Sequence, residues 1–312
     1  MSALTALMLE DLDGPAPQGL RPLLQPLEAR FGEALLGVIL YGSCRRRDQV
    51  DEGLVDLLVI VSSYRQAYGS GMSAAFNRLL PPNVYYLEAD SPQGRLRCKY
   101  AVISLGQFQR RCRHPVDLYF WARFSQPSRL VLARSDTLAN TLTNTLAETL
   151  AAARAQAARH FAGSIKPLAP PLAMPVDFWS YALATTYRCE LRPEPPSAAR
   201  RLIEADADYW TGLSGLLAEE GQATSTTATT ASGLRRMKVR MAWALRRLTG
   251  KLYNLARLFK AAGTFSNGID YIVWKVERHS GVRVEPTERM RRHPRLAAWG
   301  LAWRMWRQKG FR

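Results

Sequence analysis

The chain has 312 residues, of which 47% are hydrophobic, and it carries a formal net charge of +17. That length is enough for one large or two ordinary domains, and the charge favours a polyanionic partner: nucleic acid, a nucleotide or an anionic membrane surface. No apolar run approaches the roughly 20 residues that span a bilayer, so no transmembrane segment is expected. The start lacks the basic n-region of a secretory signal, and the four cysteines form no CxxC pair. We therefore expect no zinc knuckle, reduced thiols and a cytoplasmic protein.

The first third of the chain predicts strands with helices between them. Residues 14–26, "GPAPQGLRPLLQP", favour an irregular segment, and a helix-like stretch follows to about residue 34. Two strand-sized apolar runs come next, "LLGVILYG" and "LVDLLVIV", and then a helix through "SAAFNRLLP". The alternating segments "NVYYLEAD" and "RLRCKYAVISL" are joined by "SPQG", whose Pro and Gly predict a hairpin.

The remainder is mainly helical in its pattern. Residues 107–134 suggest helix and strand, 137–161 an Ala/Leu-rich helix, and 176–217 further helix. The segment "KPLAPPLAMP" at 166–175 is the best domain boundary. These patterns predict an α+β fold, with a mixed sheet and flanking helices in a domain over 1–165. A mainly helical domain with basic C-terminal helices is expected over 176–312.

Residues 235–263 form the clearest predicted helix. An apolar stripe recurs at spacings of four and three, with Arg246, Arg247 and Lys251 among the basic residues outside it; the stripe is Met241, Leu245, Leu248, Leu252, Leu255 and Phe259. The helix either packs on the body with a solvated basic face or lies against acidic lipid headgroups.

The C-terminal segment combines tryptophan with positive charge. Its Trp299, Trp303 and Trp306 lie among arginines and a lysine. This composition suits a membrane interface or a nucleic-acid groove, or a helix that docks on the core through its tryptophans.

The strongest chemical signal lies between residues 37 and 61. A carboxylate such as Asp56 inside an apolar strand is costly unless a cation compensates it, which makes Asp56 a metal-ligand candidate. The Gly42-Ser43 turn after the preceding strand can offer backbone N–H groups to phosphate oxygens. The alternative is that Asp56 lies at a strand edge and caps the next element.

A strand, a Gly-Ser turn, a loop and a strand with an aspartate together resemble the nucleotidyltransferase fold of the polymerase-β type. Further motifs, in order, resemble the mitochondrial-type phosphatidate cytidylyltransferase family over roughly residues 35–205. They are Tyr41-Gly42-Ser43, Asp56, Val84-Tyr85-Tyr86, Lys99 to Ser104, Leu118-Tyr119 with Arg123 and Pro127, and Tyr187 with Glu190 and Arg192. The chain departs from the superfamily at Leu58, where a second aspartate is usual, and from the family at Cys44, where a glycine is usual.

The resemblance implies an enzyme that joins CTP and phosphatidic acid into CDP-diacylglycerol and pyrophosphate. Asp56 would hold Mg²⁺, the turn Tyr41-Gly42-Ser43 would bind the triphosphate, and Lys99 would stabilise phosphate charge. Lys99 could instead be a surface lysine whose stem lies along apolar surface.

The same resemblance implies roles for three residues at the substrate phosphate. Arg123 and Arg192 would grip phosphate, or else form structural salt bridges. Glu190 would pair with Arg192 or supply the second metal ligand missing at Leu58.

Three other interpretations remain open. The enzyme could transfer a nucleotidyl group to a soluble substrate, or be a degenerate homologue that has lost activity. A nucleic-acid-binding protein is disfavoured, because the chain has no zinc, recognition-helix or RNP signature. The favoured interpretation places the protein in the cytoplasm, peripherally associated with the inner membrane.

Overall fold

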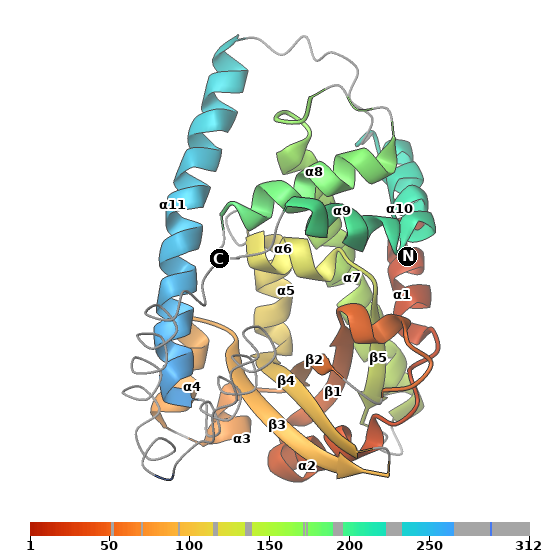
Figure 1. Ribbon diagram of the computed structural model, residues 1–312, viewed down its shortest axis with the longest axis vertical. Coiled ribbons are helices and arrows are strands. Elements are labelled where there is room, and N and C mark those ends of the chain that lie inside the picture. The colour runs from red at the N-terminus through yellow and green to blue at the C-terminus, as the bar shows by residue number, and fades with distance from the viewer. Residues whose placement is uncertain are drawn as a thin grey trace, which may run out of the picture.

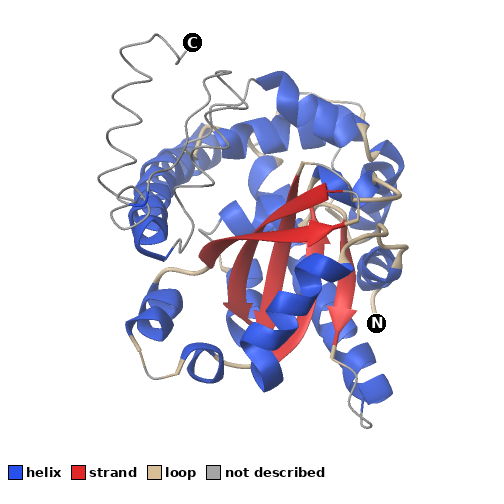
Figure 2. Ribbon diagram, turned by 60° about the horizontal axis from the view of Figure 1, so that its bottom comes forward, coloured by secondary structure: helices blue, strands red, loops and turns tan. Residues whose placement is uncertain are grey.

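The computed structural model describes residues 1–50, 53–69, 71–92, 94–114, 118–134, 139–170, 172, 174–189, 196–222, 233–264 and 288. Within this part of the chain the fold is α+β, with a five-stranded mixed sheet flanked by helices (Figures 1 and 2). This confirms the predicted fold class and the mixed sheet. The strands are β1 (Leu35–Tyr41), β2 (Leu54–Val61), β3 (Asn83–Ser91), β4 (Gly94–Ser104) and β5 (Ser128–Ala133).

The helices of the first half surround the sheet, and those of the second half follow it. The first group is α1 (Ala3–Asp13), α2 (Arg21–Phe31), α3 (Tyr64–Tyr68), α4 (Met72–Leu79), α5 (Leu105–Arg113), α6 (Leu118–Phe124) and α7 (Ala139–Ile165). The second group is α8 (Pro175–Tyr187), α9 (Pro196–Glu204), α10 (Ala207–Glu219) and α11 (Gly233–Thr264). Two short 3-10 helices, η1 (Gly32–Ala34) and η2 (Ser43–Arg46), flank β1.

The strands lie in the order β3-β4-β2-β1-β5. Strand β2 pairs with β4 in parallel, whereas the other three pairings are antiparallel. Strands β3 and β4 form the predicted hairpin, with Ser91 opposite Gly94 at its turn. Because β2 and β4 run parallel, the chain between them makes a crossover through α3, α4 and β3.

Side chains alternate between the two faces of the sheet and enter two hydrophobic clusters. Ile39, Leu58 and Ile103 lie in the larger cluster with residues of α1, α5, α6 and α7. Leu57 and Val102 point the other way, into a smaller cluster that α2 covers. Both faces of the central strands are buried, which explains why β1 and β2 read as nearly continuous apolar runs.

The N-terminal region differs from the prediction in two places. Helix α2 already begins at Arg21, so the irregular segment expected over 14–26 is wrong for its second half. Pro22 lies in the first turn, where a backbone N–H would have no helical partner, so it does not oppose the helix. Helix α1 was not predicted. The Ser2 side chain caps it by accepting a hydrogen bond from the Thr5 N–H at 3.2 Å.

The helices of the second half share the larger hydrophobic cluster. Trp179 of α8 and Trp210 of α10 are fully buried there, with ring centroids 4.8 Å apart. Phe161 of α7 lies 5.7 Å from Trp179 by the same measure, so the cluster continues across residues 166–175. The division into 1–165 and 176–312 stays a prediction.

Helix α11 docks through a face that the sequence did not single out. Trp243 is 2% exposed and donates a hydrogen bond from its indole N–H to the Ser164 carbonyl at 3.1 Å. A Cβ on Gly250 would lie 2.6 Å from the Cys189 carbonyl oxygen, so the helix approaches the end of α8 closely there.

The predicted apolar stripe of α11 faces away from the body instead. Its described members are exposed by 58% to 65%; they are Met241, Leu245, Leu248 and Leu252. The side chains of Leu255 and Phe259, and the Trp-rich segment with Trp299, Trp303 and Trp306, lie outside what the structure describes. In the described part of the chain, no helix is both long and apolar enough to cross a bilayer.

Candidate functional site

One row of side chains crosses the whole sheet at the level of Asp56. In register, Asp56 of β2 lies opposite Lys99 on one side and Tyr41 on the other. The row continues to Tyr86 beyond Lys99 and to Ser128 beyond Tyr41. Cross-strand partners point to the same face of a sheet, so these five residues from five strands share the face that carries the larger cluster.

Asp56 and Lys99 form the charged centre of this row. The Lys99 Nζ lies 3.2 Å from Asp56 Oδ1, and the two side chains are 29% and 28% exposed. Oδ1 itself is buried, and the contact is an ion pair rather than a well-aligned hydrogen bond. Lys99 therefore supplies the positive charge that makes a carboxylate tolerable inside an apolar strand.

The Gly-Ser turn lies directly against Asp56. Gly42 has φ of +81°, and a Cβ there would lie 3.2 Å from Asp56 Oδ2. Both the left-handed backbone and the close approach favour glycine at this position. Ser43 follows with an exposed side chain and begins η2. The structure thus brings together Tyr41, Gly42, Asp56 and Lys99.

Cys44, the departure from the family's second glycine, points away from the turn. Its side chain is 3% exposed in the smaller cluster, and its Sγ lies 3.4 Å from the Leu54 carbonyl oxygen. The Cys44 side chain is therefore accommodated in the core, on the other side of the sheet from Asp56.

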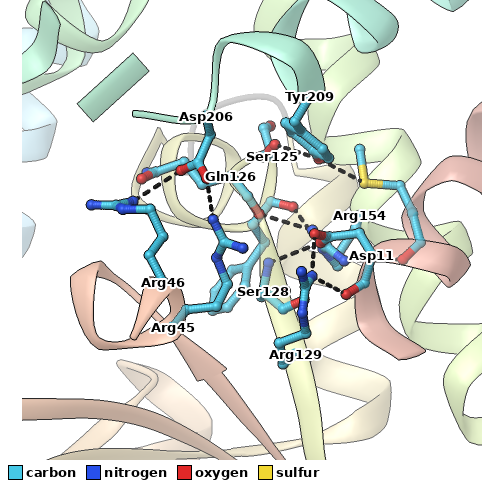
Figure 3. Close-up of polar contacts among 12 residues, drawn as sticks. Asp11, Arg45, Arg46, Ser125, Gln126, Ser128, Arg129, Arg154, Asp206 and Tyr209 are labelled. Atoms are coloured by element: carbon cyan, nitrogen blue, oxygen red, sulfur yellow. Dashed lines mark hydrogen bonds and ion pairs between the residues drawn. The ribbon is translucent and has the colours of Figure 1, made fainter. Parts of the chain in front are cut away.

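Arg45 and Arg46 continue the turn and bind one carboxylate at the start of α10 (Figure 3). Arg46 Nη1 lies 2.9 Å from Asp206 Oδ2, and Arg45 donates to Oδ1 of the same residue. Arg45 and Asp206 are 7% and 12% exposed, so this contact is largely shielded from water. The run of arginines was visible in the sequence, but its partner, about 160 residues away, carries no local signal.

A second, buried polar network lies beside these contacts (Figure 3). Arg154 is fully buried and binds Asp11 Oδ2 at 2.7 Å and the Gln126 carbonyl at 2.8 Å. Asp11 also accepts a hydrogen bond from the backbone N–H of Ser128, the residue at one end of the row. These bonds join α1, α7 and the α6–β5 connection.

Arg123 lies on α6, and the next residue of that helix, Phe124, packs against Tyr41 of the row. Phe124 and Tyr41 have ring centroids 5.9 Å apart. The Arg123 guanidinium carbon lies 4.1 Å from the ring centroid of Tyr119 on its own helix. Arg257 of α11 lies 4.6 Å from the same ring; the sequence predicted it only as one of the basic residues outside the apolar stripe of this helix. Glu190 and Arg192 lie outside the described residues.

Leu58, two residues after Asp56 on the same face of β2, is 1% exposed and packs in the larger cluster. Asp56 therefore has an apolar neighbour there and not a second carboxylate. Among the residues that the structure describes, no three His, Cys, Asp or Glu side chains cluster as a metal site.

A single protein carboxylate such as Asp56 can bind Mg²⁺ only if other ligands complete the coordination of the ion. This ion is often held by one or two carboxylates together with substrate phosphates and water. A buried carboxylate oxygen beside a glycine turn suits an ion that arrives with a nucleotide. It does not suit an all-protein cage.

Comparison with known proteins adds no relative: no protein-family model matches the chain, and no curated protein does so either.

Proposed function

We propose that the chain is a CTP:phosphatidate cytidylyltransferase built on a nucleotidyltransferase fold of the polymerase-β type. The observation that carries the proposal is the contact of the Gly42 turn with Asp56, which pairs with Lys99 on the adjacent strand. A phosphate-binding turn, a metal-ligand candidate and a cation on one sheet face are the parts that nucleotidyl transfer requires.

The proposed reaction is an in-line displacement at the α-phosphorus of CTP. A phosphate oxygen of phosphatidic acid forms the new bond to this phosphorus, and the bond to the β-phosphate oxygen breaks. Pyrophosphate leaves with the electron pair of that bond, and CDP-diacylglycerol is formed. Mg²⁺ held by Asp56 would neutralise negative charge on the nucleotide phosphates.

A single carboxylate is sufficient for this chemistry. A phosphate monoester has its second pKa near about 6 and is largely dianionic at neutral pH. The nucleophile therefore needs no general base, unlike the hydroxyl that polymerases activate. The Gly42-Ser43 turn would hold the triphosphate. Lys99, which pairs with Asp56, would stabilise negative charge on the phosphates bound there.

Helix α11 supplies the surface that would meet the lipid. The exposed stripe Met241, Leu245, Leu248 and Leu252 faces outward, and exposed basic residues flank it at Arg240, Arg247 and Lys251. An apolar stripe bordered by cations suits an anionic interface. The proposal accordingly places the enzyme on the cytoplasmic face of the inner membrane, with phosphatidic acid in that surface.

Flotation with vesicles tests the lipid-facing stripe. We expect wild-type protein to float with phosphatidate-containing vesicles and the double variant Leu245→Ser, Leu248→Ser to remain largely unbound, because two buried leucines contribute about 3 kcal/mol or more. Leu79→Ser is the matched control, since Leu79 is 75% exposed but lies on α4. Equal flotation of all three proteins would remove α11 from this role.

Product analysis tests the reaction itself. Purified protein with α-labelled CTP, Mg²⁺ and phosphatidate vesicles should form labelled CDP-diacylglycerol. Diacylglycerol, glycerol 3-phosphate and RNA serve as alternative acceptors in parallel. Label on a soluble acceptor alone would favour the soluble-substrate nucleotidyltransferase, which uses the same turn and aspartate.

A further inference from the structure

Two guanidinium groups from two helices lie close to one aromatic ring near the start of β3, and a lysine follows on one of these helices. The guanidinium carbons of Arg123 and Arg257 lie 4.1 Å and 4.6 Å from the Tyr119 ring centroid. Lys260 lies one helical turn after Arg257, on the same side of α11. All four side chains are partly exposed, so a small ligand can reach them.

The two residues of α11 are positioned by the connection that leads into β3. Arg257 donates from Nε to the Pro81 carbonyl at 3.0 Å, and Lys260 donates to the Pro82 carbonyl at 3.1 Å. Lys260 also donates to the Leu80 carbonyl. Three successive carbonyl groups thus fix the positions of both cations relative to the sheet.

The local charge is strongly positive. Burial, and then the neighbouring Arg257, lower the pKa of Lys260 to about 7. A lysine whose ammonium form is disfavoured by a nearby cation lies in an environment that an anion would stabilise. A planar guanidinium held over an aromatic ring is also preorganised for bidentate contact with phosphate.

We propose that Arg123, Arg257 and Lys260 form a binding site for a phosphate monoester, assembled between α6 and α11. The identification of this monoester as the headgroup of phosphatidic acid rests on the function proposed above. The anion site itself does not depend on that function. The site lies near the start of β3, and Tyr86 of the Asp56 row is four residues beyond Pro82. At about 3.3 Å per residue, the two places are about 13 Å apart along the strand. The site would hold the lipid headgroup at this distance from the Asp56 row, on the helix whose opposite face would meet the membrane.

The first test measures the pKa of Lys260 in the wild-type protein, and a variant serves only to assign the signal. The ammonium of Lys260 is titrated by NMR with isotopically labelled lysine, with and without inorganic phosphate, and its signal is assigned by its loss in Lys260→Arg. Bound phosphate should shift the pKa of Lys260 upward, because a dianion favours the charged form. An unchanged pKa at saturating phosphate would overturn the proposal.

The second test identifies the source of the phosphate. Calorimetry with soluble dihexanoyl phosphatidic acid should show about tenfold weaker binding to Arg257→Gln than to wild type, the effect expected for losing a charge-assisted hydrogen bond. Lys238→Gln is the control, because Lys238 is an exposed cation on the same helix about 30 Å away. Dihexanoyl phosphatidylcholine, a phosphodiester, should not bind, and CTP should bind both variants alike.

Loss of binding in both variants, or in neither, would contradict the proposal. A response to inorganic phosphate with none to dihexanoyl phosphatidic acid would reject the lipid as the source. Neither test measures cytidylyl transfer. A protein without cytidylyltransferase activity would therefore refute the proposed reaction, and the two binding tests would still decide whether the anion site exists.

Discussion

Asp56 and Lys99 lie on adjacent parallel strands, and each offsets the cost of burying the other. The pair is more than half shielded from water on both sides, so removing one partner leaves the other poorly compensated. Gly42 completes this arrangement, because it alone lets the backbone reach Asp56 Oδ2.

Replacing Gly42 with alanine tests the close approach. Gly42 has ψ of −165° as well as a positive φ, a backbone conformation that is essentially restricted to glycine and costs another residue about 1–3 kcal/mol. Gly42→Ala should lower the free energy of unfolding by more than this amount, and it should weaken CTP binding. Gly69→Ala is the matched control, because Gly69 has a φ of +72° and no atom within 4 Å of a Cβ. Urea unfolding and CTP calorimetry measure both. Identical results for the two variants would show that contact with Asp56 is unimportant.

His160 gives the fold a pH dependence of predictable sign. Its ring stacks on Trp121, with centroids 5.6 Å apart, and burial and then Arg159 lower its pKa below the ordinary value. Below about pH 6.5 the unfolded chain binds a proton at this residue that the folded chain resists, so stability falls as pH drops.

The substitution His160→Phe keeps a ring against Trp121 but removes the titration. Wild-type protein should therefore lose more stability than the variant between about pH 7 and about pH 5, as measured by urea unfolding. Parallel pH profiles for the two proteins would assign the acid sensitivity to other groups.

At the scale of elements, the sequence predicted where helix α11 begins and ends better than it predicted which face of the helix packs on the protein. The 235–263 pattern predicts α11 almost to its ends, yet its apolar stripe points outward. Docking depends on Trp243 and on the small Gly250 instead. A hydrophobic stripe indicates which face avoids water, but it does not say whether protein or lipid covers it.

Two glycine variants separate docking from helix propensity. Gly212→Ala in α10 should stabilise the protein by up to about 1 kcal/mol, because nothing lies within 4 Å of its Cβ. Gly250→Ala gains the same propensity but meets the Cys189 carbonyl at 2.6 Å, so we expect net destabilisation. Urea unfolding measures both changes, and a stabilised Gly250→Ala would contradict the close docking of α11.

Local patterns in the sequence predicted the centre of the candidate site but not its surroundings. The strands around Asp56, the turn at Gly42 and the β3–β4 hairpin are each encoded within a few residues. The carboxylates that pair with Arg45 and Arg154 lie more than 140 residues away in the sequence, so only the folded chain brings them together. Helix α1 was missed because its single capping serine is a weak signal.

Across the whole molecule, the candidate site depends on both halves of the chain. The turn after Gly42 is tied to α10 through Asp206, and the larger hydrophobic cluster runs from α1 to Trp243 of α11. The proposed membrane face and the proposed phosphate site lie on opposite sides of α11. We therefore expect the basic residues of α11 to serve an anionic membrane and a phosphate group rather than nucleic acid.

The most direct test of the central claim is the rate of CDP-diacylglycerol formation from labelled CTP and phosphatidate vesicles, compared between wild type and Asp56→Asn. The asparagine keeps the size of the side chain and removes its charge. We predict labelled lipid from the wild type and a rate at least about 100-fold lower from the variant, because the metal ligand is lost. Equal rates, or no labelled lipid from the wild type, would contradict the account.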